Sequence, residues 1–274
     1  MDTNLLNLSV GLLAAVVAAV LLWKRWRSTK PAGGIQTRVL TPLKILEHPS
    51  PNFNDRGGAT ISFLILHYTA MNTAQEALDR LSDPAAKVSA HYLVDEDGTI
   101  YRLVADDKSA WHAGVSFWSG NANLNGKSIG IEIANPGDRP FPPAQMAAVT
   151  QLCQQIVTAH GIAARHVLAH SDIAPTRKQD PGRFFDWREL ASEGIGIWPV
   201  PSANDYERSR KWVQTDLRRA LSAYGYNPDD DFKFVVTAFQ RHFQPEVFQT
   251  PVKVGVADGQ TAARLACLLR LSGG

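Results

Sequence analysis

The stretch "TISFLILHYT", Thr60 to Thr69, is a nearly continuous apolar run that leads into a histidine. Its length and its isoleucines favour a β-strand over a helix, and a strand without polar alternation is typically buried on both faces. Such a strand lies inside a sheet and not at its edge. The run therefore predicts a central strand with His67 where its apolar part ends.

Strand and helix signals alternate on the C-terminal side of this run. The segment Ala90 to Val104 contains two β-like runs about Asp97-Gly98, which is a strong hairpin signal. A helical pattern of apolar residues begins after the prolines at 142 and 143 and ends at Gly161. Strands that alternate with helices, together with a hairpin, predict an α/β fold with a mixed central β-sheet flanked by helices.

The segment "KSIGIEIAN", Lys127 to Asn135, alternates as a strand does. Its three isoleucines share one face, while Gly130, Glu132 and Ala134 share the other. A carboxylate in the middle of a strand is costly in an apolar core. Glu132 is therefore either a salt-bridged residue on a solvated face or a general base that faces a polar cavity.

The sequence changes character from about Asp205. Apolar residues at helical spacing mark three short amphipathic helices, separated by loops rich in Gly, Pro and Asp. They predict a small three-helix C-terminal domain over 205–272, after a larger domain over 43–200. The marking residues are Leu217, Leu221, Phe232, Val235, Val236, Phe239, Phe243, Leu265, Leu268 and Leu269.

The N-terminal segment from Leu5 to Trp23 carries no charge and is followed by "KRWR", Lys24 to Arg27. As a helix it is roughly 28 Å long, close to the ~30 Å core of a bilayer. It has neither the basic start nor the clear cleavage site of a signal peptide. Residues 1–27 are therefore predicted to be a transmembrane anchor, with a cleaved signal segment as the alternative, and residues 28–42 a linker.

Composition excludes several classes of protein. The 274 residues carry a formal net charge of +2, so nothing indicates a nucleic-acid partner. The two cysteines, Cys153 and Cys267, lie far apart in helix-like patterns, which excludes a disulfide framework and a cysteine-rich metal site. Both cysteines are expected to be buried as small apolar residues.

Two histidines and an aspartate form a candidate metal site. His67 and His170 each end a strand-like run, and Asp180 follows His170 in the loop "AHSDIAPTRKQDPG". Two imidazoles and one carboxylate are a ligand set of catalytic zinc. The spacing is loose and by itself a weak signal, and the alternative for each histidine is a hydrogen-bonded residue of the core or the surface. Lys178 lies in the same loop and is either a solvated surface residue or an oxyanion-stabilising group.

Five ordered motifs resemble one enzyme family. The motifs "LHYTA", "AHYLVDEDGTIYRLV", "AWHAG", "SIGIEIAN" and "AHSDIAPTRKQDPGRFFDW" are together similar to those of the zinc-dependent N-acetylmuramoyl-L-alanine amidases of the AmpD/AmiD type. The resemblance covers about residues 43–200 and implies the fold shared with peptidoglycan recognition proteins. It also implies hydrolysis of the amide bond between N-acetylmuramic acid, or its 1,6-anhydro form, and the L-alanine of peptidoglycan or muropeptides.

The resemblance also implies the roles of single residues. The family's three ligands to its one zinc ion fall on the candidate metal site described above. Its catalytic base falls on Glu132, and the group that neutralises the oxyanion together with zinc falls on Lys178. The residues expected to bind substrate are Trp111, His112 and Asn135.

The C-terminal region resembles a three-helix peptidoglycan-binding domain through "FQRHF" and "DGQT". The expected partners are therefore peptidoglycan or muropeptide fragments, and the membrane through the N-terminal segment, for a protein that is itself a monomer. The basic flank at 24–27 indicates that the chain faces the cytoplasm. The wall-binding resemblance indicates the periplasm, so a membrane-anchored envelope protein facing the periplasm is expected, with the cytoplasmic orientation as the alternative.

Two other functions stay open as alternatives. Some relatives in the recognition-protein branch bind muropeptides without catalysis, typically after a zinc ligand is lost, but here all three ligand positions are filled. A zinc peptidase acting on the stem peptide would use the same metal ligands, although the motifs argue against it. Neither the requirement for the anhydro sugar nor the preferred stem length follows from the sequence.

Overall fold

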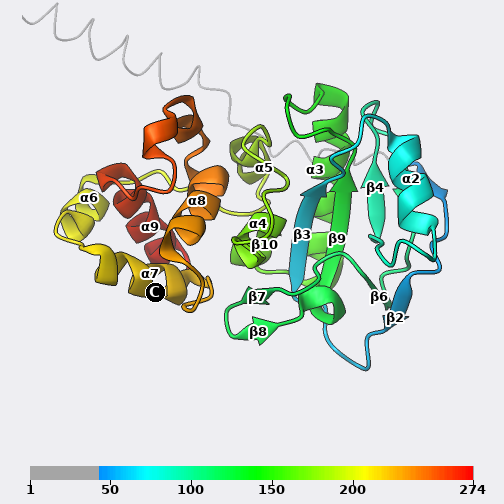
Figure 1. Ribbon diagram of the computed structural model, residues 1–274, viewed down its shortest axis with the longest axis horizontal. Helices are drawn as coiled ribbons and strands as arrows, with labels where there is room; N and C mark the ends of the chain where they lie inside the picture. The colour runs from blue at the N-terminus through cyan, green and yellow to red at the C-terminus, as the bar shows by residue number, and fades with distance from the viewer. Residues whose placement is uncertain (1–42, 274) are drawn as a thin grey trace, which may run out of the picture. The chain divides into compact units, whose positions relative to one another are not determined.

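The chain forms a mixed β-sheet covered by helices, followed by a helical C-terminal region (Figure 1). The computed structural model describes residues 43–273. The strands are β1 Ile45–Glu47, β2 Phe53–Asp55, β3 Phe63–Tyr68, β4 Tyr92–Val94, β5 Ile100–Arg102, β6 Lys108–Ala110, β7 Phe117–Trp118, β8 Asn121–Ala122, β9 Ser128–Ile133 and β10 Val167–Ala169. The α-helices are α2 Ala74–Ser82, α3 Pro143–His160, α4 His170–Ile173, α5 Trp187–Ser192, α6 Ala203–Ser209, α7 Gln214–Tyr224, α8 Phe232–Phe243 and α9 Gly259–Leu271. Short 3-10 helices are η1 Leu124–Lys127, η2 Ala164–His166, η3 Pro245–Gln249 and η4 Pro251–Lys253.

The main sheet has six strands in the order β1-β5-β4-β9-β3-β10. The pairing of β4 with β5 is antiparallel, and β3 pairs in parallel with β9 on one side and β10 on the other. This interior position explains why Leu64, Ile65 and Leu66 are all completely buried. The mixed sheet and the central place of the apolar run, both predicted from the sequence, are confirmed.

Successive side chains of β3 pack into different cores. Leu64 and Leu66 join the isoleucines of β9 and the apolar side of α3 in one cluster. Phe63 and Ile65 point to the opposite face and join a second cluster with α7, α8 and α9. His67 follows the alternation of Phe63 and Ile65, so it lies on the face opposite α3. The register pairs His67 with Glu132 of β9, which brings that carboxylate to the same face.

Local signals in the sequence are formed as predicted. Gly98 turns the β4–β5 hairpin with φ +88°, and a Cβ there would lie 2.9 Å from the carbonyl oxygen of Ala144. Helix α3 begins at Pro143 and ends at Gly161, whose φ of 63° is left-handed and whose N–H donates to Val157. The hairpin turn therefore packs against the first turn of the helix that covers the sheet.

The C-terminal region differs from the prediction in one helix. Helices α7, α8 and α9 carry the predicted apolar positions, but α6 precedes them. The apolar pattern did not predict α6, because its sequence has no apolar stripe. The helix is stabilised instead by a capping box between Ser202 and Asp205 and by the ion pair of Arg270 with Asp205. The division into domains over 43–200 and 205–272 stays a prediction.

A buried carboxylate joins this helical region to the sheet. Asp172 of α4 is 1% exposed, and it accepts hydrogen bonds from the Ala169 N–H at 2.8 Å and from the Tyr226 hydroxyl at 2.7 Å. Its Oδ2 also lies 2.6 Å from Nδ1 of His242 on α8. A buried carboxylate is costly without such partners, so these bonds fix α4 against α8. His170 is the first residue of α4, and its direction depends on the same contacts.

The predicted location needs correction. The apolar segment 5–23, on which the prediction of a membrane anchor rests, lies outside the described residues, as do the whole 1–27 segment and the linker 28–42. Among the helices of residues 43–273, none is long and apolar enough to cross a membrane. The prediction of a membrane-anchored envelope protein, in either orientation, is therefore wrong as far as the structure describes the chain.

Gly130 on β9 provides a test of the packing beneath the site. A Cβ at this position would lie 2.4 Å from Cγ and Nδ1 of the His112 ring. We expect Gly130→Ala to lower the free energy of unfolding by about 1–3 kcal/mol, as overpacking does, in urea titrations followed by circular dichroism. Gly126→Ala is the matched control, because its added methyl meets nothing within 4 Å. Equal stability of the two variants would contradict this account of the packing.

Candidate metal centre

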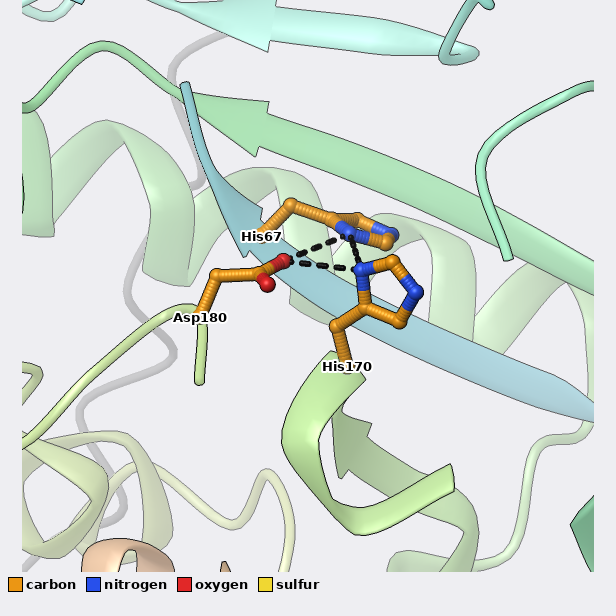
Figure 2. Close-up of side chains that lie close together, drawn as sticks. All are labelled: His67, His170 and Asp180. Carbon is orange, nitrogen blue, oxygen red and sulfur yellow. Dashed lines mark hydrogen bonds and ion pairs between the residues drawn. The ribbon is translucent and has the colours of Figure 1, made fainter. Parts of the chain in front are cut away.

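Three side chains converge beside the carboxyl ends of β3 and β10 (Figure 2). Nδ1 of His67 lies 2.9 Å from Nδ1 of His170 and 3.0 Å from Oδ2 of Asp180. The same oxygen lies 2.9 Å from Nδ1 of His170. All three residues are buried, and their ligand atoms are close enough together to hold one metal ion.

The loop between His170 and Asp180 is folded back on α4. The Ser171 N–H donates to the carbonyl oxygen of Asp180 at 3.0 Å, and the N–H groups of Arg177 and Lys178 both donate to the carbonyl oxygen of Ala174. These bonds close the loop, so that Asp180 lies next to Ser171 at the start of α4. They explain how two ligands ten positions apart reach the same point as His67 on β3.

Hydrogen bonds behind the cluster orient both imidazoles. Nε2 of His67 lies 3.0 Å from Nδ1 of His112, whose Nε2 lies 3.1 Å from the Ser128 hydroxyl. That hydroxyl donates to the carbonyl oxygen of Leu124 at 2.7 Å, so it accepts a hydrogen bond from Nε2 of His112. Nδ1 of His112 then has no proton and accepts one hydrogen bond from Nε2 of His67. Nε2 of His170 donates in the same way to the Ala113 carbonyl oxygen at 3.1 Å. Both ligand histidines therefore present an unprotonated Nδ1 to the cluster.

The electrostatics of the cluster favour a cation. Burial, with repulsion from His170, lowers the pKa of His67 to about 4, so its ring is neutral at pH 7. Burial by itself raises the pKa of Asp180, but its electrostatic interaction with His170 and His67 outweighs burial, and the pKa lies below its ordinary value. The Nδ1 lone pairs of His67 and His170 and the carboxylate of Asp180 thus lie about 3 Å apart. A single proton between them cannot form hydrogen bonds with all three acceptors. A divalent metal does, so the donor set fits zinc.

Glu132 and Lys178 line the cavity that also contains His170 and Asp180. Burial raises the pKa of Glu132 well above its ordinary value; Asp180 adds to this shift, while Lys178 opposes it. Oε2 of Glu132 is buried and has no hydrogen-bond partner among the described residues. A carboxyl group that is desolvated yet unpaired is suited to accept a proton from water in the cavity.

The cavity measures about 340 Å³ and combines an apolar wall with cationic groups. Trp111 lines it, with its indole N–H donating to the Asn54 side chain. Arg177 lines it too, but its guanidinium is already hydrogen-bonded to the carbonyl oxygens of Ala113 and Val115. Its size and mixed lining are typical of a small-molecule site.

The structure treats the three expected substrate-binding residues differently. Trp111 lines the cavity along one side. His112 reaches the cavity, but both its ring nitrogens are engaged by His67 and Ser128, so its position indicates support of a ligand rather than contact with substrate. Asn135 is completely buried outside the lining, with its Oδ1 accepting from the Gly137 N–H at 2.7 Å, and the structure does not bring it into the cavity. Its role in binding stays a prediction.

Sequence reasoning missed other residues of the lining. Tyr68, Arg80 and Gln179 all line the cavity, although none was singled out by the motifs. Tyr68 follows His67 directly, and its ring lies where a Cβ on Gly137 or Gly182 would be within 3.1 Å. Gly137 and Gly182 are the only sign in the sequence that a bulky side chain lies close to them, but only the folded chain reveals that both face the ring of Tyr68.

Comparisons with known proteins point to one family. Residues 57–183 match the family described as N-acetylmuramoyl-L-alanine amidase. The N-acetylmuramoyl-L-alanine amidase AmiD of Escherichia coli (strain K12) is 36% identical over 239 residues, covering 78% of this chain and 84% of the relative. The 1,6-anhydro-N-acetylmuramyl-L-alanine amidase AmpD of Haemophilus influenzae is 32% identical over 177 residues, covering 58% of this chain and 95% of the relative.

Solved structures agree with the sequence comparisons. A structure of E. coli AmiD in complex with the substrate anhydro-N-acetylmuramic acid-L-Ala-D-gamma-Glu-L-Lys superposes with a TM-score of 0.70 at 36% identity, covering 79% of this chain and 92% of that one. A structure of AmpDh3 from Pseudomonas aeruginosa in complex with anhydromuramic pentapeptide gives 0.69 at 32% identity, covering 81% and 95%. The similarity extends through the sheet and beyond the residues that match the family.

The chain of donors behind His67 predicts a weakened metal site when it is cut. We expect His112→Ala to lower the affinity for zinc by about 10–100-fold, the usual effect of removing a group that orients a ligand, in titrations against a competing chelator. His160→Ala is the control, because that histidine bonds to Asp106 in another part of the chain. Unchanged affinity in a folded His112→Ala protein would show that His67 is oriented without this bond.

Proposed function

The chain belongs to the N-acetylmuramoyl-L-alanine amidase family, and we propose that its catalytic centre is one zinc ion held by His67, His170 and Asp180. The protein is a hydrolase that cleaves the amide bond between N-acetylmuramic acid and L-alanine in peptidoglycan turnover. The observation that carries the proposal is the convergence of three donor atoms 2.9–3.0 Å apart at the edge of a cavity lined by Glu132.

The residues of the cavity divide the chemistry between them. When bound, zinc supplies a Lewis acid for the amide carbonyl and lowers the pKa of a water molecule. Glu132 accepts the proton of the attacking water and passes it to the amine of L-alanine as the amide bond breaks. Lys178 lines the same cavity and stabilises the negative charge that develops on the carbonyl oxygen. The neutral state of His67 keeps its Nδ1 available as a ligand at pH 7.

The substrate is proposed by similarity and by the shape of the cavity. The structures of AmiD and AmpDh3 hold anhydromuramic peptides, so we propose muropeptides of this kind as substrates here. Trp111 offers its indole as an aromatic wall for the saccharide. Binding of the polymeric wall by the C-terminal helices and the monomeric state are kept as predictions.

Replacement of the proposed base separates catalysis from metal binding. We expect Glu132→Gln to reduce kcat for release of the stem peptide by about 10²–10⁴-fold, as loss of a general base does, while the zinc content measured by atomic absorption stays unchanged. Glu189→Gln is the control, because Glu189 is exposed on α5. A Glu132→Gln protein that keeps both zinc and full activity would exclude Glu132 as the base.

Removal of the metal tests the centre itself. Dialysis against a chelator is expected to abolish hydrolysis, because the cavity then lacks the Lewis acid. Addition of one equivalent of zinc per chain is expected to restore it. Chromatography of the products distinguishes an amidase, which yields a peptide with an N-terminal L-alanine, from a peptidase that cuts within the stem. Hydrolysis that persists without any metal would contradict the proposed centre.

A further inference from the structure

Arg241 on α8 has no anionic hydrogen-bond partner among residues 43–273. Its guanidinium lies over the ring of Phe248, with Cζ 5.4 Å from the ring centroid. No hydrogen bond or ion pair joins it to another residue within 43–273, whereas Arg183 donates to a carbonyl oxygen and Arg264 to a carbonyl oxygen and a carboxylate. Burial lowers its pKa, because the side chain has lost water without gaining a hydrogen-bonded carboxylate. A partly desolvated cation of this kind is suited to an anionic ligand.

Arg241 faces a second cavity that adjoins the metal centre. This cavity measures about 360 Å³ and is lined by Arg241, Arg183 and Phe248, together with Tyr68 and Gln179. Tyr68 and Gln179 also line the cavity of the metal centre, so the two cavities share a wall. The second cavity therefore begins where the cavity of the metal centre ends, on the two sides of these residues.

The balance of charge in the second cavity is positive. Arg183 stacks over Phe184 at 4.7 Å and donates a hydrogen bond only to the Phe248 carbonyl oxygen, at 3.3 Å, among the described residues. Of the described residues that line this cavity, Asp138 is the one acidic residue, against two arginines. The carboxylates near enough to act electrostatically on Arg241 are Asp172 and Asp180, and both already lie within hydrogen-bonding distance of histidines.

The position of Arg241 relative to the proposed metal centre is fixed by the next residue, His242. His242 follows it on α8 and bonds to Asp172 at 2.6 Å, and Asp172 belongs to the helix that begins with His170. The bond between His242 and Asp172 therefore fixes α8, and with it the guanidinium of Arg241, against the helix that begins at the proposed metal ligand His170.

We propose that Arg241, assisted by Arg183, forms a subsite for a carboxylate of the stem peptide. The proposal rests on the proposed function and names the part of the substrate that the second cavity recognises. In a stem such as L-Ala-D-gamma-Glu-L-Lys, present in the AmiD complex, the γ-linkage leaves the α-carboxylate of glutamate free, and lysine ends in another. Three residues extend up to roughly 10 Å from the scissile bond, and the two cavities have Tyr68 and Gln179 in common.

Steady-state kinetics on two substrates tests the subsite. The first is anhydro-N-acetylmuramic acid-L-Ala-D-gamma-Glu-L-Lys, and the second is the same compound with both carboxylates converted to amides. We expect Arg241→Gln to raise KM for the acid at least tenfold, as loss of a charged hydrogen bond does, with kcat within about twofold and no change for the diamide. Arg241→Lys should give an intermediate KM, because it keeps the charge but not the two-pronged geometry.

Two further variants make the result specific. Arg188→Gln is the matched control, since Arg188 is exposed on α5, and it should leave both substrates unchanged. Arg80→Gln tests the competing cation in the metal cavity. An equal effect of Arg241→Gln on acid and diamide, or an acid-selective effect of Arg80→Gln alone, overturns the subsite. If Arg241→Gln fails to fold, Arg183→Gln decides in its place: an acid-selective rise in KM supports the proposal, and its absence overturns it.

Failure of the proposed function would look different. A wild-type, zinc-loaded protein that hydrolyses neither compound sinks the amidase mechanism. Calorimetry then decides the subsite separately: acid bound more tightly than diamide, with the difference lost in Arg241→Gln, retains it, and equal binding removes it.

Discussion

The parallel alignment of β9, β3 and β10 is the constraint on which the site depends. Parallel strands end at the same edge of a sheet, and the register pairs His67 with Glu132 and ends β10 one residue before His170. A shift of either register by one residue would turn His67 or Glu132 into the core under α3. The apolar packing of the isoleucines on that side prevents the shift, so hydrophobic burial on one face determines the chemistry on the other.

The buried Asp172 carries this constraint into the C-terminal region. Its bonds to His242 and Tyr226 are short and buried, and they connect the helix of a metal ligand to residues 70 and 54 positions away along the chain. Replacing His242 alone would leave this carboxylate buried without one of its hydrogen-bond partners, at a cost of about 1–3 kcal/mol. The helical region is thus part of the support of the metal centre, which is consistent with the solved relatives that match this chain through most of its length.

Small residues and donor chains set the fine geometry. Gly130 leaves room for the ring of His112, and His112 in turn holds the tautomer of His67. The sequence placed Gly130 and Glu132 on one face of a strand, but it gave no reason for the glycine. It also placed His112 among the substrate contacts, because a motif shows which residues occur together and not which of their atoms are already occupied by neighbours.

The sequence by itself determined the strands β3, β4, β5, β9 and β10, the hairpin, the long helix and the family, because apolar periodicity, turn residues and ordered motifs are local properties of the chain. It also named the histidines, the aspartate and the glutamate that gather at the site. Only the tertiary structure decided that three of their atoms come within 3.0 Å of one another and that Arg241 faces a cavity next to the metal centre. These features arise from pairing between segments far apart in the sequence, where burial and charge depend on neighbours that no local pattern specifies.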